Sequence, residues 1–274
     1  MLKRCLARFA LACAAVLCMA MPAVADTLNA RVAQLSSGLT VTRPEGAGPF
    51  PVVIMLHGCG GPRPFINDMA RHAADAGAAA IVVDSYAPRR ISRMAALATV
   101  CTGTRLHGRE RAGDLYAAVT WARRQSWAAR DRIAVMGWSH GGWTVLDALS
   151  LRSGEEMARA TGISNLPAEP LSGVQSALIV YPYTGLGSLV GRRDWRFALR
   201  STAIVAGRDY IVGTNGPREA LNRQRLRGAP LDIVLFENAT HAFEDPLAQD
   251  PRVRFNPSAT TREIELLREM IAAL

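Results

Sequence analysis

The sequence lacks several features that would mark a nucleic-acid-binding protein or a repeat protein. Among its 274 residues Lys3 is the only lysine, so arginine carries nearly all of the positive charge. The arginines are scattered and form no block, so we expect no basic stripe for a nucleic acid. No internal repeat, low-complexity stretch or linker divides residues 26–274. These absences favour a single domain over that range.

A long hydrophobic run is also missing. The apolar run at residues 9–21 is shorter than the roughly 20 residues that cross a bilayer. It follows three cations and precedes the small residues Ala-Val-Ala at 23–25. This layout predicts a signal peptide over residues 1–25, cleaved after Ala25, rather than a transmembrane anchor. We therefore expect an exported protein, periplasmic or extracellular, that is a monomer without a stable membrane anchor.

Cysteine is scarce once the signal is removed. Three of the five cysteines lie within residues 1–25, which leaves Cys59 and Cys101. Two thiols in an oxidising compartment favour one disulfide, and the alternative is two unpaired thiols, because the sequence does not give the separation of their Cα atoms.

Short apolar runs alternate with helical patterns along the rest of the chain. Runs that are apolar almost throughout are typical of buried parallel strands, and we predict strands at residues 51–57, 79–84, 132–137, 177–181, 202–206 and 231–236. Helices are predicted at residues 65–76, 109–125, 141–151, 217–227 and 261–273. The alternation predicts an α/β fold with a doubly wound, mostly parallel sheet and helices on both faces.

Three further segments complete the predicted architecture. Residues 39–43 precede a proline and are expected to form an antiparallel edge strand. Residues 153–173 and 184–196 show no clean period and are expected to be loops, either of which could frame a pocket.

A Gly-x-Ser-x-Gly motif lies where one of the predicted strands meets a predicted helix. Residues 137–141 read Gly-Trp-Ser-His-Gly. A serine hydroxyl attacks well when it projects from a sharp turn, and glycines remove the Cβ atoms that would clash there. The helix that follows directs backbone N–H groups toward developing negative charge. Ser139 is therefore the predicted nucleophile, and the alternative is a tight turn with a buried serine.

A glycine-rich turn follows the predicted strand at residues 51–57. In a doubly wound sheet it opens beside the nucleophile, so the predicted oxyanion donors are the backbone N–H groups of Cys59 and His140, with Gly58 as the alternative to Cys59. We expect His57 to brace this turn by hydrogen bonding rather than to act as the base.

The base and its acid partner are expected after other strands. His241 lies just beyond the last predicted strand and is the only histidine with a suitable place in chain order. Asp209 directly follows a buried strand and gives the order Ser, Asp, His. The rival acids lie in a charged loop or too near His241 in sequence to orient it, and they are Asp194, Glu237 and Asp245.

Several side chains near the predicted site are candidates for the substrate pocket. Trp138 adjoins the nucleophile and is interpreted as a pocket wall, whereas Trp143 is expected in the core. Tyr86 and Arg89 follow a strand at the edge where substrates bind in open α/β folds. Arg89 and the nearby arginines 90 and 93 could hold an acidic substrate, or could be solvated or paired with Asp114 or Glu110.

These motifs together resemble the dienelactone hydrolase family, specifically its secreted branch. The matching stretches are residues 57–61, 83–86 with 88–89, 137–142, 207–209 and 241–243. The resemblance implies the α/β-hydrolase fold and the triad of Ser139, Asp209 and His241. Two departures are that the founding enzymes carry cysteine where this chain has Ser139, and that Ala206 stands where the family usually has glycine.

The expected activity is cleavage of a small-molecule carboxylic ester or lactone through an acyl-enzyme on Ser139. No metal or cofactor is implied. Two alternatives stay open: a peptidase of the prolyl-oligopeptidase type, which usually has a large extra domain, and a binding protein that keeps the fold without activity.

Overall fold

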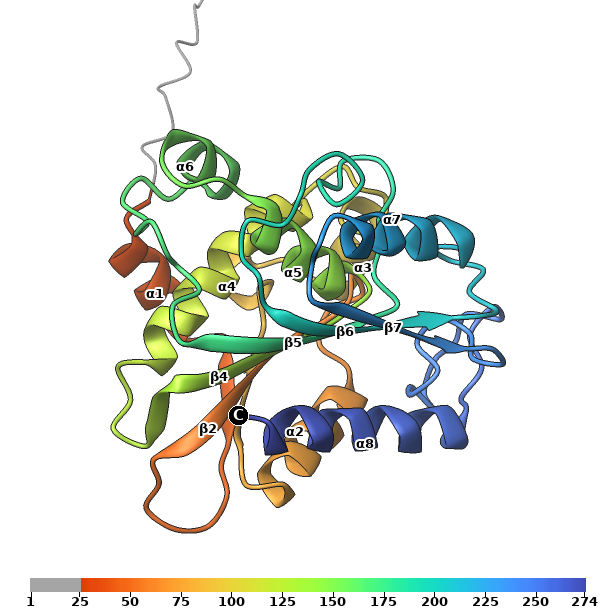
Figure 1. Cartoon of the computed structure of the whole chain (residues 1–274), viewed down its shortest axis with the longest axis horizontal. Helices are drawn as coiled ribbons and strands as arrows, with labels where there is room; N and C mark the ends of the chain where they lie inside the picture. The colour runs from red at the N-terminus through yellow and green to blue at the C-terminus, as the bar shows by residue number, and fades with distance from the viewer. Residues whose placement is uncertain (1–25) are drawn as a thin grey trace, which may run out of the picture.

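A seven-stranded sheet forms the centre of the protein in a computed structural model that describes residues 26–274 (Figure 1). The signal peptide predicted for residues 1–25 lies outside the described residues. The strand order is β1-β3-β2-β4-β5-β6-β7. The strands are β1 (Leu39–Thr42), β2 (Phe50–Leu56), β3 (Ala79–Val83), β4 (Ala128–Trp138), β5 (Val174–Val180), β6 (Arg200–Ala206) and β7 (Leu231–Phe236). Only β1 pairs antiparallel in this sheet, so the predicted mostly parallel sheet with an antiparallel edge strand is confirmed.

Helices cover both faces of the sheet, as predicted. Figure 1 shows α2 and α8 below the sheet and the other labelled helices above it. The lower pair is α2 (Pro64–Asp75) and α8 (Pro257–Ala272). The upper layer is built mainly from α1 (Leu28–Ser36), α4 (Gly108–Ala122), α5 (His140–Ser150) and α7 (Asn215–Leu226). No helix within residues 26–274 is both long and apolar enough to span a membrane.

The two-layer arrangement follows from the side-chain alternation of the buried strands. In β2 the side chains of Val52, Ile54 and Leu56 pack into the core beneath the upper helices. Val53 and Met55 pack into the second core, which faces α2 and α8. Successive side chains of a strand point to opposite faces, so a strand that is apolar throughout can supply both cores.

The structure differs from the prediction in its short helices. Residues 153–173, predicted as a loop, contain α6 (Glu155–Thr161), which begins after Gly154 and ends at Gly162 in the left-handed conformation. Two further helices were not predicted, α1 and α3 (Arg93–Thr99). Each is capped by a hydroxyl, Thr27 or Ser92, that accepts a hydrogen bond from a first-turn amide. Residues 184–196 are irregular, as predicted.

Candidate active site

The turn between β4 and α5 holds Ser139 in an unusual backbone conformation. Its φ is 53° and its ψ is −110°, a region that side chains other than glycine rarely adopt. A Cβ on Gly137 would lie 2.5 Å from the Gly141 carbonyl oxygen, and one on Gly141 would lie 2.0 Å from the Leu56 carbonyl oxygen. The glycines of the motif are therefore required by close packing, and the packed turn places Ser139 at the N-terminus of α5.

Ser139, His241 and Asp209 form one hydrogen-bonded chain. His241 Nε2 lies 2.9 Å from Ser139 Oγ, and His241 Nδ1 lies 2.7 Å from Asp209 Oδ2. The other oxygen of Asp209 accepts hydrogen bonds from the amides of Ile211 (2.9 Å) and Val212 (3.0 Å). The structure thus brings together the three residues predicted as a triad, and an Nδ1–H that donates to Asp209 leaves Nε2 free to accept the serine proton.

Two of the three rival acids are engaged elsewhere. Asp194 pairs with Arg227 at the surface, at 2.9 Å. Asp245 pairs with Arg63 at 2.7 Å, which ties the segment after His241 to the start of α2. Neither carboxylate bonds to His241.

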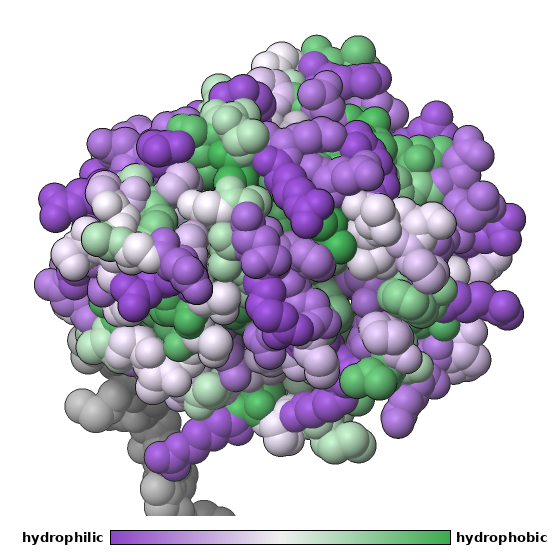
Figure 2. Space-filling view, turned by 90° about the horizontal axis from the view of Figure 1, so that it is seen from below, coloured by the Kyte–Doolittle hydropathy of each residue, from purple (hydrophilic) through white to green (hydrophobic). Residues whose placement is uncertain are grey.

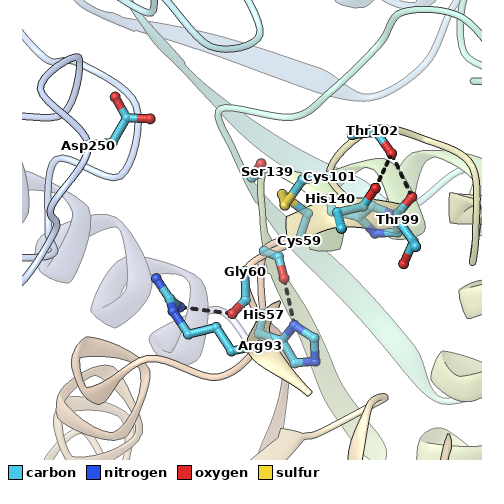
Figure 3. The surroundings of a disulfide bond; sticks show 12 residues. His57, Cys59, Gly60, Arg93, Thr99, Cys101, Thr102, Ser139, His140 and Asp250 are labelled. Carbon is cyan, nitrogen blue, oxygen red and sulfur yellow. Dashed lines mark hydrogen bonds between the residues drawn. A yellow bond between two sulfur atoms is a disulfide. The ribbon is translucent and has the colours of Figure 1, made fainter. Parts of the chain in front are cut away.

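The glycine-rich turn after β2 passes directly beside the nucleophile, since a Cβ on Gly58 would lie 3.5 Å from the Ser139 Cβ. His57 Nδ1 donates to the Gly58 carbonyl at 2.7 Å (Figure 3). His57 Nε2 accepts from the Ser85 amide at 3.3 Å. Full burial holds the pKa of His57 well below its usual value, so it stays neutral. His57 therefore braces the turn, as expected.

Further contacts fix the same turn. Tyr86 Oη donates to the Cys59 carbonyl at 2.7 Å. Arg93 donates to the Gly60 carbonyl at 2.9 Å (Figure 3). Within residues 26–274 the amides of Cys59 and His140, predicted as oxyanion donors, donate no hydrogen bond. Both amides are available to a substrate oxygen.

A disulfide joins this turn to the end of α3. Cys59 and Cys101 are bonded, with their Cα atoms 5.1 Å apart, so the structure contains the disulfide favoured by the cysteine pattern (Figure 3).

Arg111 is a central residue that sequence reasoning missed. It is fully buried in α4, and its guanidinium donates to the His57 carbonyl (3.0 Å), to His140 Nδ1 (3.0 Å) and to Ser85 Oγ (3.1 Å). It thus connects the glycine-rich turn to the residue after the nucleophile. Burial, together with the nearby Arg111 charge, lowers the pKa of His140 well below its usual value. An arginine on the apolar face of a helix was the sequence signal that could have drawn attention to it.

The prediction that Trp138 and Tyr86 line the substrate pocket is wrong, because both side chains are buried. Trp138 is 1 % exposed, donates to Glu263 at 2.7 Å and packs on Phe65, because it is the last residue of β4 and points into the core facing α2 and α8. Tyr86 is 3 % exposed, since its ring packs against His57 and its hydroxyl braces the turn.

Arg89 also turns out to be structural. Its guanidinium donates to both carboxylate oxygens of Asp114 at 2.8 Å, so the salt bridge to Asp114 that was one of the alternatives is present. Tyr183 is an aromatic residue whose backbone contacts the nucleophile residue. Its amide donates to the Ser139 carbonyl at 3.3 Å, and its half-buried ring packs on Trp143. Within residues 26–274 no three His, Cys, Asp or Glu side chains are grouped as metal ligands.

Comparison with solved structures finds similar folds at low sequence identity. A putative dienelactone hydrolase from Klebsiella pneumoniae subsp. pneumoniae MGH 78578 matches with a TM-score of 0.66 and 17% identity, over 86% of this chain and 92% of that one. A thermophilic esterase from Thermogutta terrifontis with butyrate bound has a TM-score of 0.56 and 15% identity, over 86% and 88% of the two chains. The esterase 2 of that organism, phosphonylated by sarin, has a TM-score of 0.59 and 14% identity, over 86% and 89%. These likenesses show the fold.

Comparison by sequence places the chain in a family. None of the curated proteins compared with the chain matches it. The family model of the dienelactone hydrolase family matches residues 38–182, which is more than half of the chain. The chain therefore belongs to the dienelactone hydrolase family, within the α/β-hydrolase superfamily, and is a carboxylic ester hydrolase.

Proposed function

We propose that this protein is an exported serine hydrolase that cleaves a carboxylic ester or lactone through an acyl-enzyme on Ser139. The observation that carries the proposal is the hydrogen-bonded chain from Ser139 through His241 to Asp209, beside two unengaged backbone amides. A nucleophile, a base, an orienting carboxylate and oxyanion donors are the parts that acyl transfer needs.

The reaction follows from these positions. His241 Nε2 takes the Ser139 proton as Oγ attacks the carbonyl carbon, and the carbonyl oxygen becomes an oxyanion that the Cys59 and His140 amides stabilise. The protonated imidazole, stabilised by Asp209, then gives its proton to the departing alcohol oxygen. Water attacks the acyl-enzyme by the same route in reverse, with His241 again as base, and the acid product leaves.

Similar structures support the choice of chemistry. One solved structure shows the Thermogutta terrifontis esterase with butyrate bound. Another shows esterase 2 of the same organism phosphonylated by sarin. A small carboxylic acid and a phosphonylating agent are respectively a product and an inhibitor of the kind that we expect for this protein.

The proposal that the protein is exported rests on residues 1–25. Their cationic start, short apolar run and small residues before Asp26 have the order of a secretory signal peptide. A disulfide between Cys59 and Cys101 suits an oxidising compartment. We expect the mature protein to be a monomer that belongs to the secreted branch of the family.

Labelling with a fluorophosphonate tests the nucleophile, and a substrate panel tests the reaction. We expect mass spectrometry to find the label on Ser139, and purified residues 26–274 to hydrolyse p-nitrophenyl esters or lactones. A label on another serine with Ser139 unmodified would overturn the assignment. Turnover of peptide amides without ester or lactone hydrolysis would indicate a peptidase instead.

A further inference from the structure

The ring of Tyr181, the residue after β5, packs against the ring of His241, the proposed catalytic base. Its ring lies 4.5 Å from the His241 ring, centroid to centroid, at an angle of 53°. Its φ is 33°, an uncommon conformation for a bulky residue, and its amide is held by the Ile204 carbonyl at 2.8 Å. Strained backbone of this kind persists where the surrounding structure fixes it, and it gathers at functional sites.

Two buried carboxyl groups accept hydrogen bonds from Tyr181 and from Trp138. Glu244, 2 % exposed, accepts a hydrogen bond from the Tyr181 hydroxyl. Glu263 of α8 is fully buried and accepts from Trp138 Nε1 at 2.7 Å. Trp138 directly precedes Ser139, so the two carboxyls contact the neighbours of both the nucleophile and the base.

Each carboxyl has one oxygen, Oε2, with no hydrogen-bond partner among residues 26–274. Burial and the negative charge of Glu263 raise the pKa of Glu244 well above its usual value, and burial raises the pKa of Glu263 to about 8. Val180, which precedes Tyr181, is the register partner of Trp138 on the neighbouring strand, so the two carboxyls accept from side chains at the same end of β4 and β5. One proton shared between the carboxyls would supply the missing partner to both.

The charged side chains around Glu244 form no ion pair with its carboxylate among residues 26–274. Asp245 adds negative charge from the same segment but is paired with Arg63 of the α2 N-cap. From α2, Arg71 and His72 line the same cavity as Glu244, and Arg71 is paired with Asp68. Arg43 after β1 and Asp75 at the end of α2 line the cavity as well. The pKa of Glu244 is thus raised first by its burial and then by the negative charge of Glu263.

We propose that Tyr181, Glu244 and Glu263 are positioning residues for His241, and that they hold it in place only while the two carboxyls share a proton. The proposal rests on the proposed function, because its effect is exerted through His241. With the proton in place, Glu244 anchors the Tyr181 hydroxyl, and the Tyr181 ring supports the imidazole against Ser139.

Loss of that proton would leave both buried carboxyls negatively charged. The Glu244 side chain has room to change its conformation, because it lines a cavity of about 610 Å³ between α2 and α8. Figure 2 looks onto this face, where hydrophobic surface shows between hydrophilic side chains. Movement of Glu244 into the cavity would release the Tyr181 hydroxyl and loosen the support of His241.

The test compares pH profiles of kcat for the wild-type protein and three variants. We expect the wild-type kcat to fall as the pH rises past roughly 8, where the pair loses its proton. Glu244→Gln places a neutral amide that can accept from Tyr181 and donate to Glu263, so kcat should not fall over that range. Tyr181→Phe keeps the ring but loses the anchor, and should lower kcat about tenfold with KM changed less than about twofold.

Asp147→Asn is the matched control, because Asp147 is also a buried carboxyl with a raised pKa but does not contact the triad. This variant should keep the wild-type alkaline limb. If Glu244→Gln does not fold, Glu263→Gln makes the same test, since it too removes the shared charge.

If kcat falls at high pH in the same way in the wild type and in Glu244→Gln, the proposal is overturned. A Tyr181→Phe variant with wild-type kcat would overturn it as well. A wild type that hydrolyses no ester or lactone would instead overturn the proposed function, and this inference with it.

Discussion

At the scale of single residues, backbone strain gathers around the proposed triad. Ser139, Tyr181 and Ala242 all have positive φ, at 53°, 33° and 48°. The first is the proposed nucleophile, and the other two contact or adjoin His241. Each strained residue costs of order 1–3 kcal/mol and persists because the surrounding structure fixes it. Such cost at three points of one site is expected where geometry has been kept for chemistry rather than for stability.

Ser139→Ala should lower esterase activity by at least about a thousandfold, because it removes the hydroxyl that lies 2.9 Å from His241 Nε2. The hydroxyl projects from the turn, so its removal should leave the fold unchanged. Steady-state kinetics with a p-nitrophenyl ester and a thermal melt of the same preparation check both statements. Substantial turnover by this variant would mean that another residue is the nucleophile.

Asp209→Asn should keep substrate binding and lose most of the turnover. An amide at this position can donate to His241 Nδ1 and so stabilise the tautomer that cannot accept the serine proton. Asp194→Asn is the matched control, because that carboxylate lies at the surface with Arg227. Kinetics of the two variants decide the matter, and loss of activity in the control alone would show that the acid was misassigned.

The positions of Ser139, Asp209 and His241 could be predicted because each follows a strand whose apolar run is plain in the sequence. Chain order then left few candidates. Trp138 and Arg111 could not be placed in this way, because their roles depend on which layer a side chain faces. Trp138 lies one residue from Ser139 and yet points into the opposite core, toward α8.

At the scale of elements, α3 was the consequential omission from the prediction. Seven residues give too few turns for a clear apolar period, so its cap at Ser92 was the main sequence signal. The helix matters because it carries Arg93, which bonds the Gly60 carbonyl, and leads to Cys101. A segment whose arginines were expected to bind substrate, to be solvated or to form salt bridges is therefore a support for the glycine-rich turn.

Replacing both Cys59 and Cys101 by alanine should lower the free energy of unfolding by about 4 kcal/mol in the chain-entropy model, since the bridge closes a loop with a sequence separation of 42. Urea denaturation of the wild type and the double variant measures the difference. A reduced wild type should behave like the variant, which separates the effect of the bridge from that of the new side chains. Equal stability of all three would contradict the prediction.

At the scale of the whole molecule, buried ionisable groups make stability depend on pH. Burial raises the pKa of Asp147 to about 7 and of Glu263 to about 8, and raises that of Glu244. An acid whose pKa is higher in the folded state binds more protons there than in the unfolded chain. Its contribution is fully present below the unfolded pKa of roughly 4 and is lost as the pH rises through the folded value.

The buried histidines act in the other direction. Burial lowers the pKa of His57 and His140 well below the usual value of 6.5. Their contribution is present above the unfolded pKa of about 6.5 and is lost as the pH falls below it. Between roughly pH 4 and 6.5 the two sets oppose each other, so stability should change less there than the carboxyls alone would cause. Above that range the histidines are neutral in both states, and the carboxyls alone decide the slope.

The free energy of unfolding should therefore fall by roughly 2 kcal/mol between about pH 6.5 and 8, as Asp147 and the Glu244–Glu263 pair lose protons that the folded state holds. Urea denaturation at these two pH values measures the fall. In Asp147→Asn the amide oxygen can still accept from the Leu189 amide, which bonds Asp147 at 2.8 Å, so the fold is kept while one titration is removed. That variant should show a fall smaller by about 1 kcal/mol, whereas Asp194→Asn at the surface should match the wild type. A wild type whose stability rises over this range would mean that the buried carboxyls are ionised in the folded protein, and the shared proton behind His241 would then be absent as well.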